Sequence, residues 1–351
     1  MVVRGWKPAD MHKPLMPWLL VAPLGLVLAG CAAPSQLGQG DRQRVAGRTF
    51  VVAGASSGLG RGAAVKLASY GANVVLAARR AEVLQEVAAQ ARAGGGQALV
   101  VPTDVSNPDQ VERLAKAALA RFGRIDVWIN DAAVAAIGRF DDIPVEDHAR
   151  IVDVNLKGVI YGSHAALRQF RRQGFGTLVN IASVEGRVPL AYHASYAATK
   201  HAIIGLDAAL IQELRLSGAE GIKISTVLPW AVDTPFWDHT ANYSGGTPRI
   251  YTMDGASEVV DAIVWDTVHP VKEYAVGWKA AGTVLGARVW PGLAERVAAD
   301  LVHMSQITTA PTAAPTKGSL YEPMQAGTGV EGGARARMDR EDRARRGTEE
   351  R

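Results

Sequence analysis

The segment AGASSGLG, from Ala53 to Gly60, decides the fold. It follows the apolar run TFVV and precedes a helix expected over residues 61–70. Its glycines meet separate needs, since Gly54 permits a tight turn, Gly58 lets the backbone approach an anion, and the last glycine allows close helix packing. A helix N-terminus adds free N–H groups and the positive end of the helix dipole. The segment therefore predicts a phosphate-binding turn, with a dinucleotide as its ligand.

Apolar runs and helix-length amphipathic segments alternate on both sides of this turn. The expected strands read TFVVAGA, NVVLAA, ALVVPTD, IDVWIN, TLVNIAS and KISTVLP, and the expected helices include residues 61–70, 81–92, 108–122 and 196–216. This alternation predicts an α/β fold, a doubly wound parallel sheet (Rossmann fold) with right-handed crossovers and helices on both faces.

The second half of the chain is less regular. Residues 230–254 are rich in aromatic residues, glycine and proline, and we expect a loop or lid there. A helix over residues 257–268, a strand in EYAVGW and a helix over residues 291–304 follow. We expect one domain over residues 45–305 and a flexible tail over residues 306–351, because the tail has few apolar residues.

Composition excludes several classes of function. The chain has 351 residues, 48% of them hydrophobic, and a formal charge of +4. Its basic residues are spread among acidic ones, so we expect no nucleic-acid partner. Its one cysteine, Cys31, excludes a disulfide within the chain and a cysteine-rich metal site, and we expect no metal.

The N-terminus has the layout of an export signal. Basic residues precede an apolar run that ends in LAGC, and residues 1–31 resemble the signal of bacterial lipoproteins, with Cys31 as the lipidated residue. Residues 32–44 are small and polar and predict a tether. We therefore expect a lipoprotein anchored to the membrane through Cys31, the alternative being a cytoplasmic protein.

The end of the second expected strand bears on the choice of nucleotide. A carboxylate there would bind the adenosine ribose of NAD, but this chain has arginines and no acid. Arg79 is positioned to clamp a 2′-phosphate, which predicts NADP(H). Arg80 is expected to be exposed to solvent, or else to be the alternative contact. Asp104, after the third strand, could accept a hydrogen bond from adenine or could cap the next helix.

Four further residues stand at informative spacings. Tyr196 and Lys200 are four apart on one expected helix, Ser183 ends a strand 13 residues before the tyrosine, and Asn155 lies 28 residues earlier still. In the order and spacing of these residues, and in its glycine turn, the chain resembles the short-chain dehydrogenase/reductase family over roughly residues 45–278. The family's tetrad falls on Asn155, Ser183, Tyr196 and Lys200, and its glycine motif on Gly54, Gly58 and Gly60.

The resemblance implies a hydride transfer between nicotinamide and an alcohol or ketone. Tyr196 would be the acid or base, and Lys200 would lower its pKa and hold the nicotinamide ribose. Ser183 would orient the substrate carbonyl. Asn155 would hold a proton-relay water, although the residues alone favour a role in capping a helix or in a turn. Ser56, Asn130 and Thr234 complete the expected cofactor contacts.

Some residues depart from the family's pattern or add to it. Trp230 replaces a usual glycine, and Asp131 and Ala133 replace a usual Asn and Gly. His193 could line the substrate site or be structural. The aromatic residues of the lid, Phe236, Trp237 and Tyr243, suggest an apolar substrate or a seal against water.

The function expected from the sequence is an NADP(H)-dependent oxidoreductase acting on small carbonyl or alcohol substrates. The alternative is a catalytically inactive NADP-binding redox sensor or interaction module. Alanine-rich helices such as residues 197–210 are compatible with a homo-oligomer.

Overall fold

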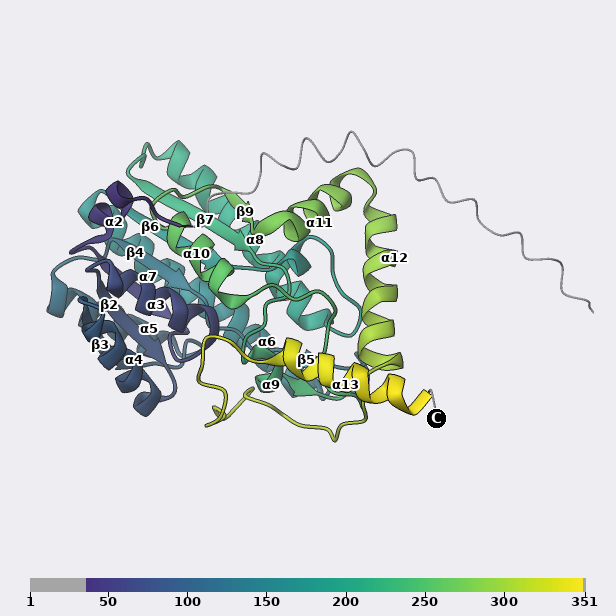
Figure 1. The fold of residues 1–351 in the computed structure, drawn as a ribbon. Coiled ribbons are helices and arrows are strands. Elements are labelled where there is room, and N and C mark those ends of the chain that lie inside the picture. The colour runs from purple at the N-terminus through teal and green to yellow at the C-terminus, as the bar shows by residue number, and fades with distance from the viewer. Residues whose placement is uncertain (1–35, 350–351) are drawn as a thin grey trace, which may run out of the picture.

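The computed structural model describes residues 36–349 (Figure 1). The signal-like segment and Cys31 lie outside these residues. Within the described part, no helix is both long and apolar enough to cross a bilayer.

A seven-stranded sheet forms the centre of the molecule, as expected for the α/β class. All its strand pairs are parallel, and their order is β3-β2-β1-β4-β6-β7-β9. The strands are β1 (Thr49–Ala53), β2 (Asn73–Ala78), β3 (Gln97–Pro102), β4 (Val127–Asn130), β6 (Gly176–Ile181), β7 (Ile222–Leu228) and β9 (Glu273–Ala275). Strand order reverses between β1 and β4, and ligands of doubly wound folds bind at such a switch point.

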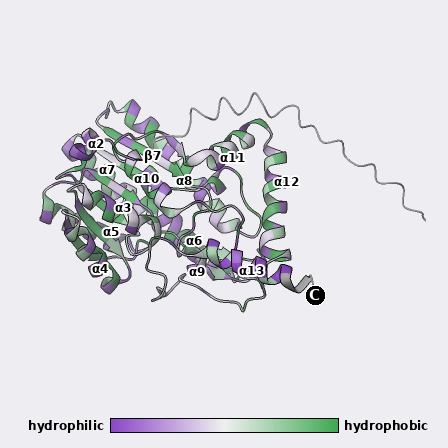
Figure 2. Cartoon of the chain, viewed as in Figure 1, coloured by the Kyte–Doolittle hydropathy of each residue, from purple (hydrophilic) through white to green (hydrophobic). Residues whose placement is uncertain are grey.

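Helices cover both faces of the sheet because the central strands are apolar on both sides. In β1, Phe50 and Val52 pack toward α3 (Gly58–Ser69), α4 (Ala81–Ala93) and α10 (Ala256–Asp266). Val51 packs toward α5 (Pro108–Phe122), α7 (Gly158–Gln173) and α8 (Ala194–Leu216). Figure 2 shows these strands as mainly hydrophobic.

Smaller elements lie above the carboxyl ends of the strands. They comprise α6 (Val145–Val152), the π-helical turn Asp153–Lys157, the short helix α9 (Phe236–His239), and the paired strands β5 (Ala136–Ile137) and β8 (Ala241–Asn242). The region expected as an irregular lid therefore contains a helix and a strand. Beyond it, α11 (Gly277–Val289) and α12 (Pro291–Val302) stand at the edge of the molecule (Figure 1).

Part of the expected tether is helical. Helix α2 (Gln39–Val45) begins within it, and Leu37 and Val45 are buried in the core beside the sheet. A hydrogen bond between His269 and Asp41 adds a polar contact. Two apolar side chains on a short segment suffice to dock it, although they form no recognisable period.

The expected flexible tail is folded against the domain. After a π-helical turn at His303–Thr308, the chain crosses the molecule and ends in α13 (Ala334–Glu349), drawn in yellow in Figure 1. Leu320, Ala334 and Met338 are buried. The tail has no regular apolar pattern, and hydrogen bonds to distant side chains help to hold it in place. Figure 2 shows α13 as mainly hydrophilic.

Candidate active site

A cavity of about 810 Å³ opens at the carboxyl ends of the strands. Its walls include Gly54, Arg79, Ser183, Tyr196 and Lys200, which come from four different loops or helices. The fold therefore brings the glycine turn and three of the four tetrad residues into one space.

The glycine turn requires its glycines. Gly54 has φ +109°, and a Cβ there would lie 2.7 Å from the backbone nitrogen of Ala132. A Cβ on Gly60 would lie 2.5 Å from the carbonyl oxygen of Gly54. Asp131 accepts a hydrogen bond of 2.8 Å from the Gly60 N–H, so the unusual acid holds the turn.

The cavity fits a dinucleotide at this end. Ser56, Gly58, Arg79 and Asp104 all line it, with no carboxylate at the end of β2. Backbone N–H groups at the start of α3 and nearby guanidinium groups are the chemistry that phosphates require.

Both arginines after β2 reach the cavity. Arg80 is buried and donates hydrogen bonds to the hydroxyls of Ser56 (3.0 Å) and Ser57 (2.9 Å). It is thus a partner of the turn rather than the solvated residue that the sequence allowed. Arg79 donates to the carbonyl oxygens of Ser319 and Tyr321, each at 2.6 Å.

Asp104 already has partners. Its carboxylate accepts from the Ser106 hydroxyl at 2.7 Å and from Arg150 at 2.9 Å. Asp104 does not cap the next helix, because Asn107 is the N-cap of α5, and Asp104 also borders the cavity.

Ser183, Tyr196 and Lys200 meet at the middle of the cavity. The Ser183 hydroxyl accepts from the N–H of Glu185 at 3.1 Å and lies beside the phenol of Tyr196. Lys200 donates to the carbonyl of Ile181 at 2.7 Å, and its Nζ lies 5.4 Å from the centre of the Tyr196 ring. One turn of α8 separates the tyrosine from the lysine, which places both on one face.

The protonation of this group follows from its burial. Burial raises the pKa of Tyr196 well above its usual value, and the negative charges of Glu185 and Asp131 add to this effect. Burial lowers the pKa of Lys200 to about 8, although the same two acids oppose the shift. The phenol therefore keeps its proton at neutral pH.

Asn155 lies behind the cavity, fully buried in the π-helical turn. Its side-chain oxygen accepts from the Val134 N–H at 2.8 Å, and its amide donates to the Val134 carbonyl at 2.9 Å and to Thr199 at 3.3 Å. The side chain thus fixes the backbone after β4 relative to α8.

Of the two other expected cofactor contacts, Thr234 lines the cavity and Asn130 does not. Thr234 lines the cavity next to Gly58, where an added Cβ would lie 3.5 Å from the threonine Cβ. Asn130 differs from the prediction, because its side chain is not among the residues lining the cavity. Instead it accepts from Trp128 and donates to Asn180, each at 2.8 Å, in a buried network.

The departures from the family's pattern at Ala133 and Trp230 cause no backbone strain. Ala133 lines the cavity without a positive φ, so its β-carbon causes no strain. Trp230 also lines the cavity, and its indole N–H donates to the Thr252 carbonyl at 3.1 Å. Phe236 packs 5.6 Å from the Tyr196 ring, between ring centres.

Comparison with known proteins decides the family. The family model described as short chain dehydrogenase matches residues 48–243. This chain belongs to the short-chain dehydrogenase family. It is 31% identical over 278 residues to the uncharacterised oxidoreductase YxnA of Bacillus subtilis, covering 78% of each chain. An uncharacterised oxidoreductase of Staphylococcus aureus is 39% identical over 223 residues, which cover 64% of this chain and 92% of the relative.

A solved structure supports the same assignment. An alcohol dehydrogenase from the archaeon Thermococcus sibiricus, complexed with 5-hydroxy-NADP, matches with a TM-score of 0.57 and 26% identity. The match covers 64% of this chain and 94% of that one. The protein is therefore an oxidoreductase of the short-chain dehydrogenase family with a nicotinamide cofactor.

Two more polar residues line the site of this short-chain dehydrogenase, and the sequence had singled out only one of them, His193. Glu185 was not singled out by the sequence, yet it lines the cavity beside Tyr196. His193 lines it too, and its Nδ1 lies 3.1 Å from the Glu185 carboxylate. Their separation by eight residues across a turn carried no signal in the sequence. The pair gives this dehydrogenase a buried polar group at the substrate end of its cavity.

Proposed function

We propose that this short-chain dehydrogenase is an NADP(H)-dependent oxidoreductase that interconverts a ketone or aldehyde and an alcohol. The observation that carries this proposal is the cavity shared by Ser183, Tyr196 and Lys200 with the glycine turn and Arg79. When bound, the nicotinamide supplies or accepts the hydride.

The protein's own groups handle the proton and the substrate oxygen. Tyr196, which holds its proton at neutral pH, donates it to the oxygen of a carbonyl substrate as that oxygen gains charge. Ser183 holds the same oxygen by a hydrogen bond. This protonation state favours carbonyl reduction near neutral pH.

Lys200 and Asn155 support the tyrosine. The ammonium group of Lys200 places a positive charge within 5.4 Å of the phenol ring, where it favours charge on the phenol oxygen after the proton has left. We assign it the nicotinamide ribose as well. Asn155 is the candidate for holding the water that returns the proton, next to the backbone that it already fixes.

The preference for NADP(H) rests on the two arginines. Arg79 and Arg80 border the cavity at the end of β2, where a ribose-binding carboxylate would select NAD. Guanidinium groups bind phosphates through paired, charge-assisted hydrogen bonds. The bound 5-hydroxy-NADP of the archaeal alcohol dehydrogenase is consistent with this choice.

The substrate is apolar and elongated. Beyond Tyr196 the cavity continues along α12, where Leu293, Val297 and Leu301 line it in steps of four residues. These side chains are 61%, 49% and 47% exposed, so an apolar wall stands open at the substrate end. An aliphatic chain lying along this wall would bury them.

Anchoring at the membrane through Cys31 is part of the proposal. The layout of residues 1–31 supports it, and a diacylglyceryl group would hold the enzyme stably at a bilayer. An open apolar wall near the catalytic centre is compatible with substrates taken from such a surface.

A cofactor and substrate screen tests the proposed function. Purified full-length protein is mixed with NADPH or NADH and a panel of aldehydes and ketones, and loss of absorbance is followed. We expect oxidation of NADPH that depends on the carbonyl compound and exceeds that of NADH. No oxidation of either nucleotide with any carbonyl would contradict the proposal.

A further inference from the structure

The chain between Ser319 and Gly332 crosses the nucleotide end of the cavity. It lies outside residues 48–243, which the family model matches. We call residues 319–332 the strap. It passes from the end of β2 to the start of α3, the two places that carry the phosphate-binding groups (Figure 1).

The first part of the strap is held beside the adenosine end. Leu320 is fully buried in a cluster of side chains that includes Ala53 and Val105. Its carbonyl accepts a hydrogen bond of 2.9 Å from Arg150. Arg79 holds the carbonyls on either side of this leucine.

The middle of the strap follows the glycine turn. Its carbonyl oxygens accept hydrogen bonds at four points, in the order Met324 from Arg80 (2.9 Å), Ala326 from His239 (2.9 Å), Thr328 from Arg61 (2.8 Å) and Gly329 from the N–H of Gly58 (2.9 Å). Partial negative charges thus face the arginines and the N-terminus of α3, where phosphates would also be attracted.

The far end of the strap is fixed by α13. The Gly332 N–H donates to the carbonyl of Asp233 at 3.1 Å, and the Ala334 N–H donates to its carboxylate at 2.7 Å. A Cβ on Gly332 would lie 2.3 Å from the backbone of Thr234, so the strap lies directly on one of the expected cofactor contacts.

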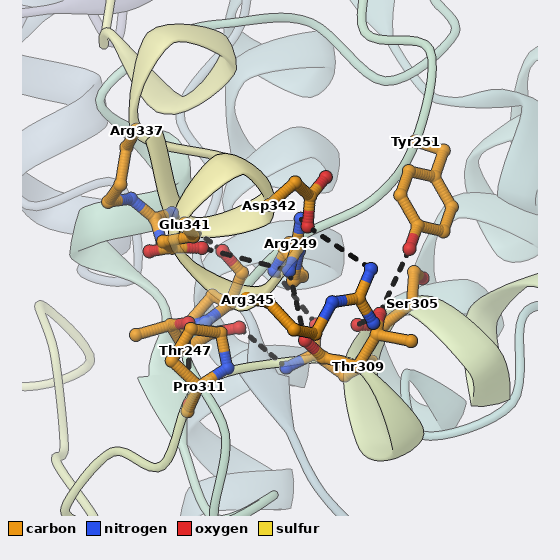
Figure 3. Close-up of polar contacts among 12 residues, drawn as sticks. Thr247, Arg249, Tyr251, Ser305, Thr309, Pro311, Arg337, Glu341, Asp342 and Arg345 are labelled. Carbon is orange, nitrogen blue, oxygen red and sulfur yellow. Dashed lines mark hydrogen bonds and ion pairs between the residues drawn. The ribbon is translucent and has the colours of Figure 1, made fainter. Parts of the chain in front are cut away.

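A buried ion pair anchors α13 itself (Figure 3). Arg249, only 1% exposed, donates to Asp342 at 2.7 Å and lies 3.8 Å from Glu341. Arg337 of α13 donates to the Pro248 carbonyl at 2.6 Å. Removing the acids would leave a buried charge without its partners, which is costly.

The strap is a wall of the cavity, because Ser319, Pro323 and Met324 line it together with Gly54, Ser56 and Asp104. Between its anchors at Leu320 and Ala334, none of the strap's residues is buried. Val330 is half-buried against the core, but a segment with few buried side chains between fixed ends can detach locally without global unfolding.

We propose that the strap completes the dinucleotide site and holds the nicotinamide nucleotide inside it, so that the nucleotide leaves only when the strap detaches. This inference rests on the proposed function, since it concerns the same cofactor. The strap could instead compete with the nucleotide for the arginines and for Gly58. In that case variants that loosen the strap would bind NADPH more tightly, not release it faster.

The test compares release of NADPH from full-length variants. NADPH fluorescence is followed in a stopped-flow instrument after mixing the complex with excess NADP⁺. One variant carries Glu341→Ala and Asp342→Ala together, a second carries Leu320→Ala, and the control is Asp339→Ala, an exposed acid on the same helix. We expect release about tenfold faster or more from the first two, the size of a lost buried contact, and unchanged release from the control.

Equal release rates in all four proteins would overturn the inference, as would tighter NADPH binding by the loosened variants. Hydrogen exchange of the unmutated protein gives a second measurement that does not depend on how the variants fold. We expect saturating NADPH to slow amide exchange at residues 319–332 by about tenfold or more, as expected for a segment whose local opening is suppressed. If NADPH binds but gives no added protection there, the proposed role of the strap is contradicted and the proposed function is not. If no nucleotide binds, both are contradicted.

Discussion

The Nζ atom of Lys200 lies 5.4 Å from the centre of the Tyr196 ring, inside a cavity that also holds Ser183. The acids Asp131 and Glu185 raise the pKa of Lys200, and burial lowers it further than they raise it. The charge state of the lysine therefore changes near neutral pH, while that of the tyrosine does not.

This relationship predicts the pH dependence of carbonyl reduction. Lys200 is positively charged below a pKa of about 8 and neutral above it. We expect kcat/KM with NADPH to be constant below this pH and to fall above it. In Asp131→Asn the opposing negative charge is gone, so the fall should begin at lower pH. The exposed control Asp141→Asn should leave the profile in place, and identical profiles for all three proteins would contradict this role of Asp131.

The arginine at the end of β2 predicts a selective loss of NADPH affinity. Arg79→Ala should raise the KM for NADPH by about tenfold or more, the worth of a charge-assisted hydrogen bond, and leave the KM for NADH unchanged. Arg92→Ala, on the exposed surface of α4, is the matched control. Equal losses for both nucleotides would show that Arg79 acts through its contacts with Ser319 and Tyr321 and not through a 2′-phosphate.

The open wall along α12 predicts selectivity for chain length. In a series of 2-alkanones, each added methylene should raise kcat/KM by up to about fourfold, or ~0.8 kcal/mol, until the wall is covered. Val297→Gln and Leu301→Gln should reduce this gain for long ketones and spare short ones. Arg296→Gln, exposed and outside the cavity lining, should change neither. Turnover independent of chain length would contradict the elongated apolar substrate while leaving the oxidoreductase in place.

The sheet and the glycine turn could be predicted because their signals are local. Strands β1 and β2 are apolar runs bounded by glycine-containing turns, and the switch point follows from their alternation with helices. The meeting of Ser183, Tyr196 and Lys200 in one cavity was predictable from the resemblance, and the tyrosine and lysine lie on one helix face in any case.

The strap and the polar pair could not be predicted, because both depend on contacts between distant residues. Arg79 meets Ser319 across 240 positions, and the tail's few apolar residues show no period. Glu185 meets His193 only through the turn between β6 and α8. Asn130 ends a strand as expected, but the side to which its side chain turns is decided by Trp128 and Asn180.

Cys31 predicts the location of the protein in the cell. If it carries a lipid, full-length protein should sediment with membranes and be released by detergent, since acyl chains bury their methylenes in the bilayer. Cys31→Ala should move to the soluble fraction in a fractionation followed by immunoblotting. A soluble unmutated protein would contradict the anchor and would leave the proposed chemistry unaffected.

The role of Tyr196 is tested most directly by Tyr196→Phe, with Tyr192→Phe as the control. Tyr192 lies four residues earlier, before α8 begins, and its hydroxyl is hydrogen-bonded to His303. The measurement is the single-turnover rate of NADPH oxidation with a carbonyl substrate, at matched NADPH occupancy. We expect Tyr196→Phe to lose about 10²- to 10⁴-fold, the usual contribution of a general acid, and Tyr192→Phe to keep the unmutated rate. An unchanged rate in Tyr196→Phe would contradict the assignment of this tyrosine as the proton donor.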